Sequence, residues 1–204
     1  MVIKEQSILL RPAKPVFEEG LKFAHYLDQA AEGFFRIMLG RESESIIASA
    51  FIESGHTLSH ENVLFVEVDT KIVGMSSTFT EKQHRMFSDE PLRRAAKRNA
   101  IRLKLVRTLF APLWRILETI PEGDFYVQGI AIEPEFRGAG IGSLLMNDIE
   151  NRAIASGSNR LTLDVSAKND GARRLYKRLG MIESSTWPNS RLFPTVFIRM
   201  SKSL

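Results

Sequence analysis

The sequence predicts one domain of mixed helix and strand structure (an α/β fold of the α+β kind) that covers residues 1–204. Short runs of apolar and β-branched residues lie between turn residues, which indicates strands. They alternate with longer segments in which apolar residues recur at helical spacing. One strand leads through a glycine-rich loop into a helix. With 204 residues, of which 44% are hydrophobic and 25% charged, the chain can bury a substantial core.

The N-terminal part of the chain is expected to form a short strand and then helices. Pro12 and Pro15 end the strand, because proline cannot donate a backbone hydrogen bond. The strand is predicted at residues 7–11, and helices are predicted at residues 16–29, 34–39 and 42–53. The inner face of the first helix is expected to carry Val16, Leu21, Ala24 and Leu27.

A β-hairpin is predicted next. Its strands are residues 63–68 and 72–80, joined by a turn at residues 69–71. His56 and His60 lie in the loop before the hairpin. With Glu61 they do not make the convergent ligand set that a metal requires, so no metal is expected. Surface or capping roles are predicted for both histidines.

Residues 81–123 form a basic, mainly helical segment. The segment holds ten Lys or Arg against five acidic residues, a net charge of +5, while the rest of the chain is −1. Pro91 suits a first helical position, and Pro112 would end or kink the helix. The predicted apolar face is Leu92, Ala95, Ala96, Leu103, Val106 and Leu109 or Phe110, and the predicted basic face is Arg93, Arg94, Lys97, Arg98, Arg102 and Lys104.

Three interpretations of this segment compete. In the first, an amphipathic helix packs across the fold and its basic face is solvated. In the second, the segment is a lid or a dimer contact over a binding site. In the third, it is a basic surface for nucleic acid, ribosome or anionic lipid. The first two are favoured, because charge runs are usually solvated and no aromatic residues alternate with the basic ones to stack on bases. Nucleic acid is therefore not expected as a partner.

The centre of the sequence is a strand, a glycine-rich loop and a helix. The strand is predicted at residues 125–132, the loop is Arg137–Gly142, and the helix carries Leu144, Leu145, Ile149, Ala153 and Ile154. The first N–H groups of a helix have no intrahelical partner, and glycines let an anion approach the backbone. Arg137 adds a cation at the rim. The loop is therefore predicted to hold a pyrophosphate or a similar polyanion.

Two common phosphate loops do not fit this spacing. The glycines at 138, 140 and 142 are spaced G-x-G-x-G, whereas a dinucleotide fold needs G-x-G-x-x-G, and a P-loop needs a lysine that is missing here. A second motif follows: a strand at 161–165, Asn169–Ala172 opening a helix at 170–179, Leu175–Tyr176, and Leu179–Met181. Residues 125–181 thus resemble the GNAT N-acetyltransferase superfamily, whose coenzyme A loop is written Q/R-x-x-G-x-G/A. Met181 stands where the family usually has phenylalanine.

The resemblance implies a GNAT fold, with a central mixed but mostly antiparallel sheet of six to seven strands flanked by helices. Residues 81–123 would then be an insertion before the central strand, and a loop at 187–190 and a last strand at 194–200 would close the sheet. Acetyl-coenzyme A is the implied co-substrate. The implied cofactor-binding residues are Ile130, Ala131, Ile132, Arg137, Gly138, Ala139, Gly140, Ile141, Gly142, Ser143, Asn169 and Tyr176.

Each group of these residues has an implied task. The strand at 130–132 would pair with the pantetheine amides, and the amides of residues 138–143 would bind the pyrophosphate. Asn169 is also expected to cap its helix. Tyr176 is the predicted catalytic acid that protonates the departing thiolate, since the pKa of a phenol, about 10, is close to that of the thiol.

The sequence does not single out the general base that would take a proton from the amine. It also does not single out the residues that would form the wall of the acceptor pocket. Some relatives carry a glutamate base near the position of Tyr126, and Gln128 on the same strand face cannot act as a base. The candidate bases are Glu67, Glu133 and His84, and Phe34 and Phe35 are candidates for the acceptor pocket.

The expected function is transfer of an acetyl group to a primary amine of a small molecule, peptide or protein, with the acceptor and the acyl length left open. The alternative is a catalytically weak acyl-coenzyme A-binding or interaction module that acts through the basic segment. A homodimer through that segment or the last strand fits either function. A cytoplasmic location is expected, because the sequence has no cysteine, no secretory h-region and no apolar run of membrane-spanning length.

Overall fold

The computed structural model describes residues 7–109, 111, 119–189 and 194–204. The strands are β1 (Ile8–Pro12), β2 (Val63–Val68), β3 (Lys71–Thr80), β4 (Asp124–Ile132), β5 (Arg160–Ser166), β6 (Ile182–Trp187) and β7 (Phe197–Ser203). The helices are α1 (Phe17–Ala30), α2 (Phe34–Leu39), α3 (Ser43–Phe51), α4 (Glu81–Met86), α5 (Glu90–Ala96), α6 (Ala100–Leu109), α8 (Ile141–Ala155) and α9 (Asp170–Arg178). Single 3-10 turns are η1 (His60–Asn62), η2 (Lys97–Asn99) and η3 (Pro134–Phe136).

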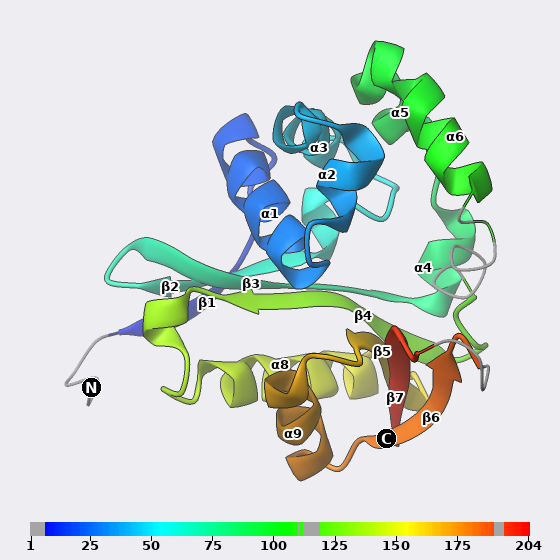
Figure 1. Cartoon of the computed structure of the whole chain (residues 1–204). Coiled ribbons are helices and arrows are strands. Elements are labelled where there is room, and N and C mark those ends of the chain that lie inside the picture. Colours follow the sequence, from blue (N-terminus) through cyan, green and yellow to red (C-terminus); the bar gives the residue numbers. More distant parts are fainter. Residues whose placement is uncertain (1–6, 110, 112–118, 190–193) are drawn as a thin grey trace.

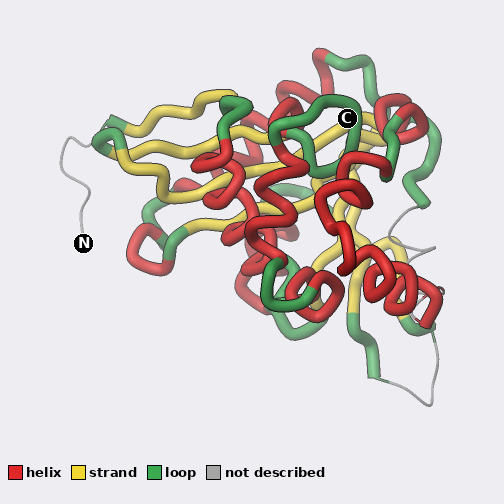
Figure 2. The backbone as a smooth tube through the Cα atoms, turned by 90° about the horizontal axis from the view of Figure 1, so that it is seen from above, coloured by secondary structure: helices red, strands yellow, loops and turns green. Residues whose placement is uncertain are grey.

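A seven-stranded sheet runs through the molecule in the order β1-β2-β3-β4-β5-β7-β6. Helices α1, α2, α3, α5 and α6 lie on one side of the sheet and α8 and α9 lie on the other (Figure 1). Seen from above in Figure 2, the helices lie across the strands. Every strand pair is antiparallel except β4 with β5. The predicted mixed, mostly antiparallel sheet flanked by helices is confirmed.

The parallel strands β4 and β5 separate about halfway along β4. They pair only from Asp124 with Arg160 to Val127 with Leu163. Beyond that point β4 continues beside β3, and β5 continues beside β7. Residues 128–132 of β4 therefore have no strand partner on the β5 side within the described chain. We call this opening between the two strands the fork.

A β-bulge at Gln128 sets which side chains of β4 face each layer. Val127 pairs with Thr78 and Gly129 pairs with Ser77, so Gln128 is the extra residue. Before the bulge, Phe125 and Val127 pack in the cluster under α8. After it, Ile130 still packs on the α8 side, while Ala131 belongs to the core beneath α1.

The N-terminal elements lie within a few residues of their predicted bounds, but part of the predicted inner face of α1 is wrong. Ala24 and Leu27 are buried as expected, whereas Val16 and Leu21 are exposed. Val16 is the N-cap, outside the helix proper. Leu21 lies about 120° around the helix axis from Leu27. Phe23 and Tyr26 occupy the inner face instead, and both are almost fully buried.

The basic segment forms several short helices where one long helix was expected. Thr80 and Gln83 cap α4 reciprocally, which the sequence prediction missed. The longer helix is interrupted at Lys97, whose φ of 45° is incompatible with a helix. Of the predicted apolar face, Ala96 and Leu103 are buried but Leu109 is 68% exposed. Phe110 and residues 112–118 lie outside the described residues.

The predicted basic face is exposed throughout: Arg93, Arg94, Lys97, Arg98, Arg102 and Lys104. Some of these side chains nonetheless tie the segment to the N-terminal helices. Arg94 forms an ion pair with Glu53 just after α3. Arg102 donates two hydrogen bonds to the backbone carbonyl of Ile37 in α2. The segment thus packs beside α2 and α3 with its charges at the surface.

The C-terminal part closes the sheet as a β-hairpin. The last strand begins at Phe197, three residues later than predicted, and continues to Ser203. Met181 fills a core position and is 2% exposed. On helix α8, Leu145, Ile149 and Ala153 are buried, whereas Leu144 and Ile154 are exposed.

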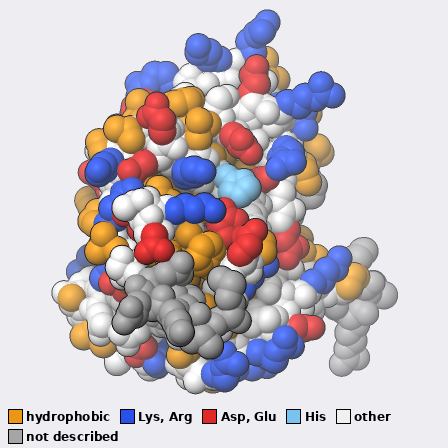
Figure 3. Space-filling model, turned by 90° about the vertical axis from the view of Figure 1, so that its left-hand side faces the viewer, with side chains coloured by type: hydrophobic (Ala, Val, Ile, Leu, Met, Phe, Trp, Pro, Cys, Tyr) orange, Lys and Arg blue, Asp and Glu red, His pale blue; other side chains and the backbone are white. Residues whose placement is uncertain are grey.

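The surface view in Figure 3 shows acidic and basic side chains interspersed on one face of the molecule. Among the described residues, no helix has the length and apolar character needed to cross a bilayer.

Candidate active site

The glycine loop joins the end of β4 to the start of α8. Gly138 and Gly140 have φ of 77° and 87°, a conformation that favours glycine. A Cβ atom built at either residue would meet no atom within 4 Å. The backbone of the loop is therefore open on the side from which a ligand would approach.

The first turn of α8 presents backbone N–H groups at this opening. Gly140 is the N-cap and provides no side-chain cap. The first helical bond runs from Leu144 N to Gly140 O at 3.0 Å. The N–H groups of residues 141–143 thus lack a helical acceptor and carry the positive end of the helix dipole. These are the groups expected to bind an anion.

Three elements meet at the same place. A Cβ atom on Gly142 would lie 3.0 Å from Leu175 Cδ2 and 3.6 Å from Ile132 Cδ1. The start of α8 is therefore packed against both α9 and the end of β4, and a larger residue at 142 would separate them. The exposed Arg137 donates a 2.9 Å bond from Nε to the Ile132 carbonyl, which fastens the loop to β4.

Tyr176 reaches the fork from the α8 side of the sheet. It lies on α9, is 8% exposed, and belongs to the same packed cluster as Val127 and Ile130 of β4. Burial raises the pKa of its phenol to about 12, and its hydroxyl has no hydrogen-bond partner among the described residues. The phenol is therefore protonated at neutral pH.

Asn169 and two basic residues of α9, Arg173 and Lys177, have structural partners. Asn169 accepts a 3.0 Å bond from Ala172 N, so the predicted capping role is confirmed. Arg173 and Lys177 both pair with Glu183 of β6. Those pairs tie α9 to β6.

A cavity of about 1210 Å³ lies on the opposite side of the sheet from Tyr176. Its floor is formed by Tyr126 and Gln128 of β4 with Asp164 of β5. Its walls come from α1 and α2 on one side and from α5 and α6 on the other (Figure 1). Phe34 and Phe35 both line it, as predicted for an acceptor pocket.

The polar floor of this cavity was missed by the sequence analysis. The hydroxyl of Tyr126 donates a 2.9 Å bond to Asp164 Oδ2, and Arg199 of β7 donates to both oxygens of the same carboxylate at 3.0 and 2.7 Å. Burial and the adjacent carboxylate raise the pKa of Tyr126 well above its ordinary value. Next to them, Gln128 Oε1 accepts a 2.8 Å bond from Ser77 Oγ, which leaves the Gln128 amide to face the cavity as a donor.

Only one of the three candidate bases lines the cavity. Glu67 is paired with Arg11 at 2.7 Å on β1 and β2, at the far edge of the sheet. Glu133 accepts a 3.0 Å bond from the buried Tyr26 hydroxyl. His84 does line the cavity, and its ring stacks on Phe79 with centroids 5.6 Å apart.

Of the two roles predicted for His56, surface or capping, the structure supports capping, because the buried ring bonds backbone carbonyls at the end of α3. His56 is 2% exposed, and its Nε2 lies 2.9 Å from the Ala50 carbonyl while Nδ1 accepts a 3.3 Å bond from Leu58 N. These contacts indicate the neutral tautomer with the proton on Nε2. Burial lowers the pKa of this ring. His60 bonds the Phe51 carbonyl, and no cluster of metal-ligand side chains occurs among the described residues.

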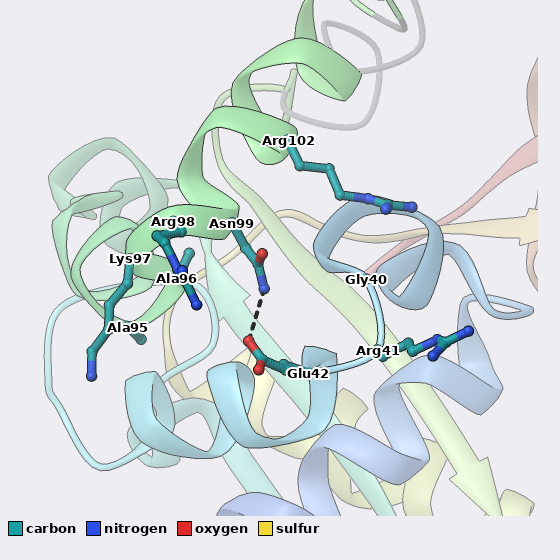
Figure 4. Close-up of a pocket in the computed structure, with 9 residues that line it drawn as sticks. All are labelled: Gly40, Arg41, Glu42, Ala95, Ala96, Lys97, Arg98, Asn99 and Arg102. Carbon is teal, nitrogen blue, oxygen red and sulfur yellow. Dashed lines mark hydrogen bonds between the residues drawn. The ribbon is translucent and has the colours of Figure 1, made fainter.

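A second, smaller cavity of about 540 Å³ lies between the α2–α3 connection and the α5–α6 break. Figure 4 shows Asn99 directed toward Glu42, with a 3.1 Å hydrogen bond between them, and several basic side chains around the opening. No residue of the glycine loop, β4 or α9 lines it. It is therefore separate from the candidate active site.

The sequence and the fold can now be compared with known proteins. The sequence model that describes the acetyltransferase (GNAT) family matches residues 24–181 of this chain. The match spans most of the chain, including the glycine loop and the second motif. This protein belongs to the acetyltransferase (GNAT) family.

Two named relatives match shorter stretches. The chain is 36% identical over 67 residues to the thialysine N-epsilon-acetyltransferase of Bos taurus, which covers 31% of this chain and 39% of that protein. It is 34% identical over 80 residues to the mycothiol acetyltransferase of Corynebacterium aurimucosum, which covers 38% of this chain and 26% of that one. The chain thus aligns with less than half the length of either relative.

Solved structures support the fold over nearly the whole chain. A crystal structure described as an acetyltransferase matches with a TM-score of 0.67 at 23% identity, covering 96% of this chain and 98% of that one. An N-acetyltransferase from Staphylococcus aureus Mu50 matches with a TM-score of 0.65 at 15% identity, covering 95% and 100%. At sequence identities of 23% and 15%, the similarity to these structures shows a shared fold and nothing more.

Proposed function

We propose that this protein transfers the acetyl group of acetyl-coenzyme A to a primary amine that enters through the large cavity. The observation that carries the proposal is the fork. The glycine loop follows the end of β4 that has no strand partner on the β5 side among the described residues, Tyr176 packs with β4 on the α8 side, and the cavity floor lies on the other side of the sheet.

The chain offers suitable groups for coenzyme A. The open backbone of Gly138 and Gly140 and the first amides of α8 suit a pyrophosphate. The edge of residues 130–132, which has no strand partner on the β5 side among the described residues, suits the amides of pantetheine, which would add as a short strand; the Ile132 carbonyl already accepts a bond from Arg137. When bound, acetyl-coenzyme A would supply an activated thioester.

The amine would attack the thioester carbonyl while the carbon–sulfur bond breaks. The Tyr176 phenol would then give its proton to the departing thiolate. The Tyr126 and Gln128 side chains would position the amine from the cavity floor. A backbone N–H of residues 130–132 would stabilise the negative charge on the carbonyl oxygen. The amine would lose its own proton to water or to His84, which faces the cavity.

The names of the two relatives support an amine acceptor in general. We also propose a cytoplasmic location, which rests on the lack of cysteine in the chain. The alternative function, a catalytically weak coenzyme A-binding module, would use the same loop but would not need Tyr176.

The test is calorimetric titration of the purified protein with acetyl-coenzyme A, coenzyme A and a nicotinamide dinucleotide, followed by a thiol-release assay with amines. We expect binding of the first two ligands only, and thiol release that depends on the amine. Binding of the dinucleotide alone, or no binding by a folded sample, would overturn the proposal.

A further inference from the structure

The large cavity has a charge distribution of its own. Asp164 lines its floor, whereas Arg199, the partner of Asp164, does not line the cavity. Three basic residues, Arg93 of α5 and Lys104 and Arg107 of α6, also line the cavity.

Two of these basic residues are already paired with acids. Arg107 forms an ion pair with Asp89, and Arg93 forms one with Glu90 at 3.0 Å. The ammonium group of Lys104 has no ion pair or side-chain hydrogen bond with any residue in the described ranges. The cavity thus has a carboxylate at its floor, which Arg199 already pairs, and on the α6 side a lysine without an ion pair among the described residues.

The space between these two poles is apolar. Phe34 and Phe35 of α2, Phe79 of β3, Phe87 and Leu92 contribute side chains to the lining. A pocket for a drug-sized ligand occupies about 300–1,000 Å³. The volume here, about 1210 Å³, is larger than a compact amine would fill.

From this arrangement we infer that the acceptor is an amine with a long apolar body that ends in an anionic group. The ammonium or amine end lies at Tyr126 and Asp164, the body contacts the phenylalanine-lined walls, and the anionic end reaches Lys104. This inference rests on the proposed function, since it assigns the acceptor class of the same site.

The inference can be tested with three amines that share one eight-carbon body: ω-aminooctanoic acid, octylamine and α,ω-diaminooctane. Calorimetry would measure their dissociation constants with and without coenzyme A, and a thiol-release assay would measure their KM values. For the unmodified protein we expect the amino acid to bind about five- to tenfold more tightly than octylamine, and the diamine to bind most weakly.

The decisive variant is Lys104→Glu, which should reverse the order of the amino acid and the diamine. Lys104→Met, which keeps an apolar stem of similar length, should make the amino acid and octylamine bind alike. The matched control is Lys82→Glu, an exposed lysine of α4 that does not line the cavity. It makes the same change in net charge and should leave the order unchanged.

The outcomes separate the two proposals. If coenzyme A binds and amines are acetylated, but the three probes rank alike or Lys104→Glu does not reverse their order, the acceptor class is wrong and the function stands. If coenzyme A does not bind, the function fails, while probe binding without coenzyme A still decides on the charge pattern. Failure of every probe to bind at millimolar concentration overturns the inference.

Discussion

The hydroxyl of Tyr126 donates a 2.9 Å hydrogen bond to the carboxylate of Asp164 across the fork. Tyr126 pairs with Thr162 in the sheet, so the bond reaches two residues further along β5, to the point where the strands have separated. Arg199 of β7 holds the same carboxylate. Three strands are thus linked by side chains where backbone pairing between β4 and β5 ends.

Tyr126→Phe should therefore weaken the fold. The variant loses one hydrogen bond to a carboxylate, while Arg199 keeps Asp164 paired, so we expect a loss of about 1–2 kcal/mol in the free energy of unfolding. Urea denaturation measures this loss. In an Asp164→Asn background, where the acceptor remains but its charge is lost, the same substitution should cost less, and equal costs in both backgrounds would show that the charge adds nothing to the bond.

The same tyrosine predicts a dependence on alkaline pH. Because the pKa of Tyr126 is raised in the folded state, the folded protein keeps a proton that the unfolded chain loses above about pH 10. This contribution to stability is complete below that pH and is lost as the pH rises further. Tyr126→Phe should flatten the decline in stability above pH 10 measured by urea denaturation.

A substitution in the glycine loop should lower the affinity for coenzyme A while the protein stays folded. Gly140→Asp places a side chain and a negative charge at the N-terminus of α8, where a phosphate would bind, and should weaken coenzyme A binding at least about tenfold. Gly157→Asp is the matched control. Gly157 lies just past the other end of α8, has φ of 72°, and has equally open space for a Cβ.

Both substitutions place a non-glycine residue at positive φ and should reduce stability, Gly157→Asp somewhat more, because an acidic side chain is disfavoured at the C-terminal end of the helix dipole. Thermal melting checks that Gly140→Asp is no less stable than this control. Unchanged coenzyme A affinity in a folded Gly140→Asp protein, measured by calorimetry, would remove the loop from the cofactor site.

If Tyr176 is the catalytic acid, substituting it should lower turnover and leave coenzyme A binding almost unchanged. Tyr176→Phe removes the proton donor and should lower kcat about 10²-fold, while the dissociation constant of coenzyme A changes less than about twofold. Since burial raises the pKa of this phenol to about 12, wild-type activity should not decline from its ionisation between pH 7 and pH 10. Tyr26→Phe, another buried tyrosine, controls for lost packing.

If Tyr176→Phe leaves turnover unchanged, the phenol is not the acid. The protein would then fit better as a coenzyme A-binding module. An equal, small decrease in turnover and affinity would indicate a structural role in the cluster with Val127.

Local features of the site could be predicted from sequence, and long-range ones could not. The strand, the glycine loop and the start of α8 are consecutive, so their geometry follows from residues next to one another. The carboxylate at the cavity floor depends on residues 126, 164 and 199, which lie on three strands whose register the sequence does not state. The bulge at Gln128 and the break at Lys97 each depend on one backbone conformation that tertiary packing selects.

The buried His56 predicts a fall in stability at mildly acidic pH. Because its pKa is lowered in the folded state, the unfolded chain binds a proton below pH 6.5 that the folded protein rejects. The contribution is complete above pH 6.5 and is lost as the pH falls from there toward the lowered pKa. His56→Gln does not titrate and should reduce the slope of unfolding free energy between pH 7 and pH 5.5.

Glu61, whose pKa is lowered chiefly by the Gly55 N–H, loses its contribution only at lower pH, from about 4.5 downward. The pH ranges in which His56 and Glu61 lose their contributions are separate, so the slope of the unfolding free energy near pH 6 reports on His56.

The break between α5 and α6 predicts a stabilising substitution. Lys97 has φ of 45° and ψ of −116°, a conformation that is costly for any residue with a Cβ. Lys97→Gly should therefore raise the free energy of unfolding by about 1 kcal/mol despite the added freedom of the unfolded chain. Arg98→Gly removes the same charge from the next residue, whose φ is not positive, and should lower stability by about 0.5–1 kcal/mol. Opposite signs in urea denaturation would support a strained hinge at Lys97, whereas a loss of stability in both variants would mean that α5 and α6 do not break there in solution.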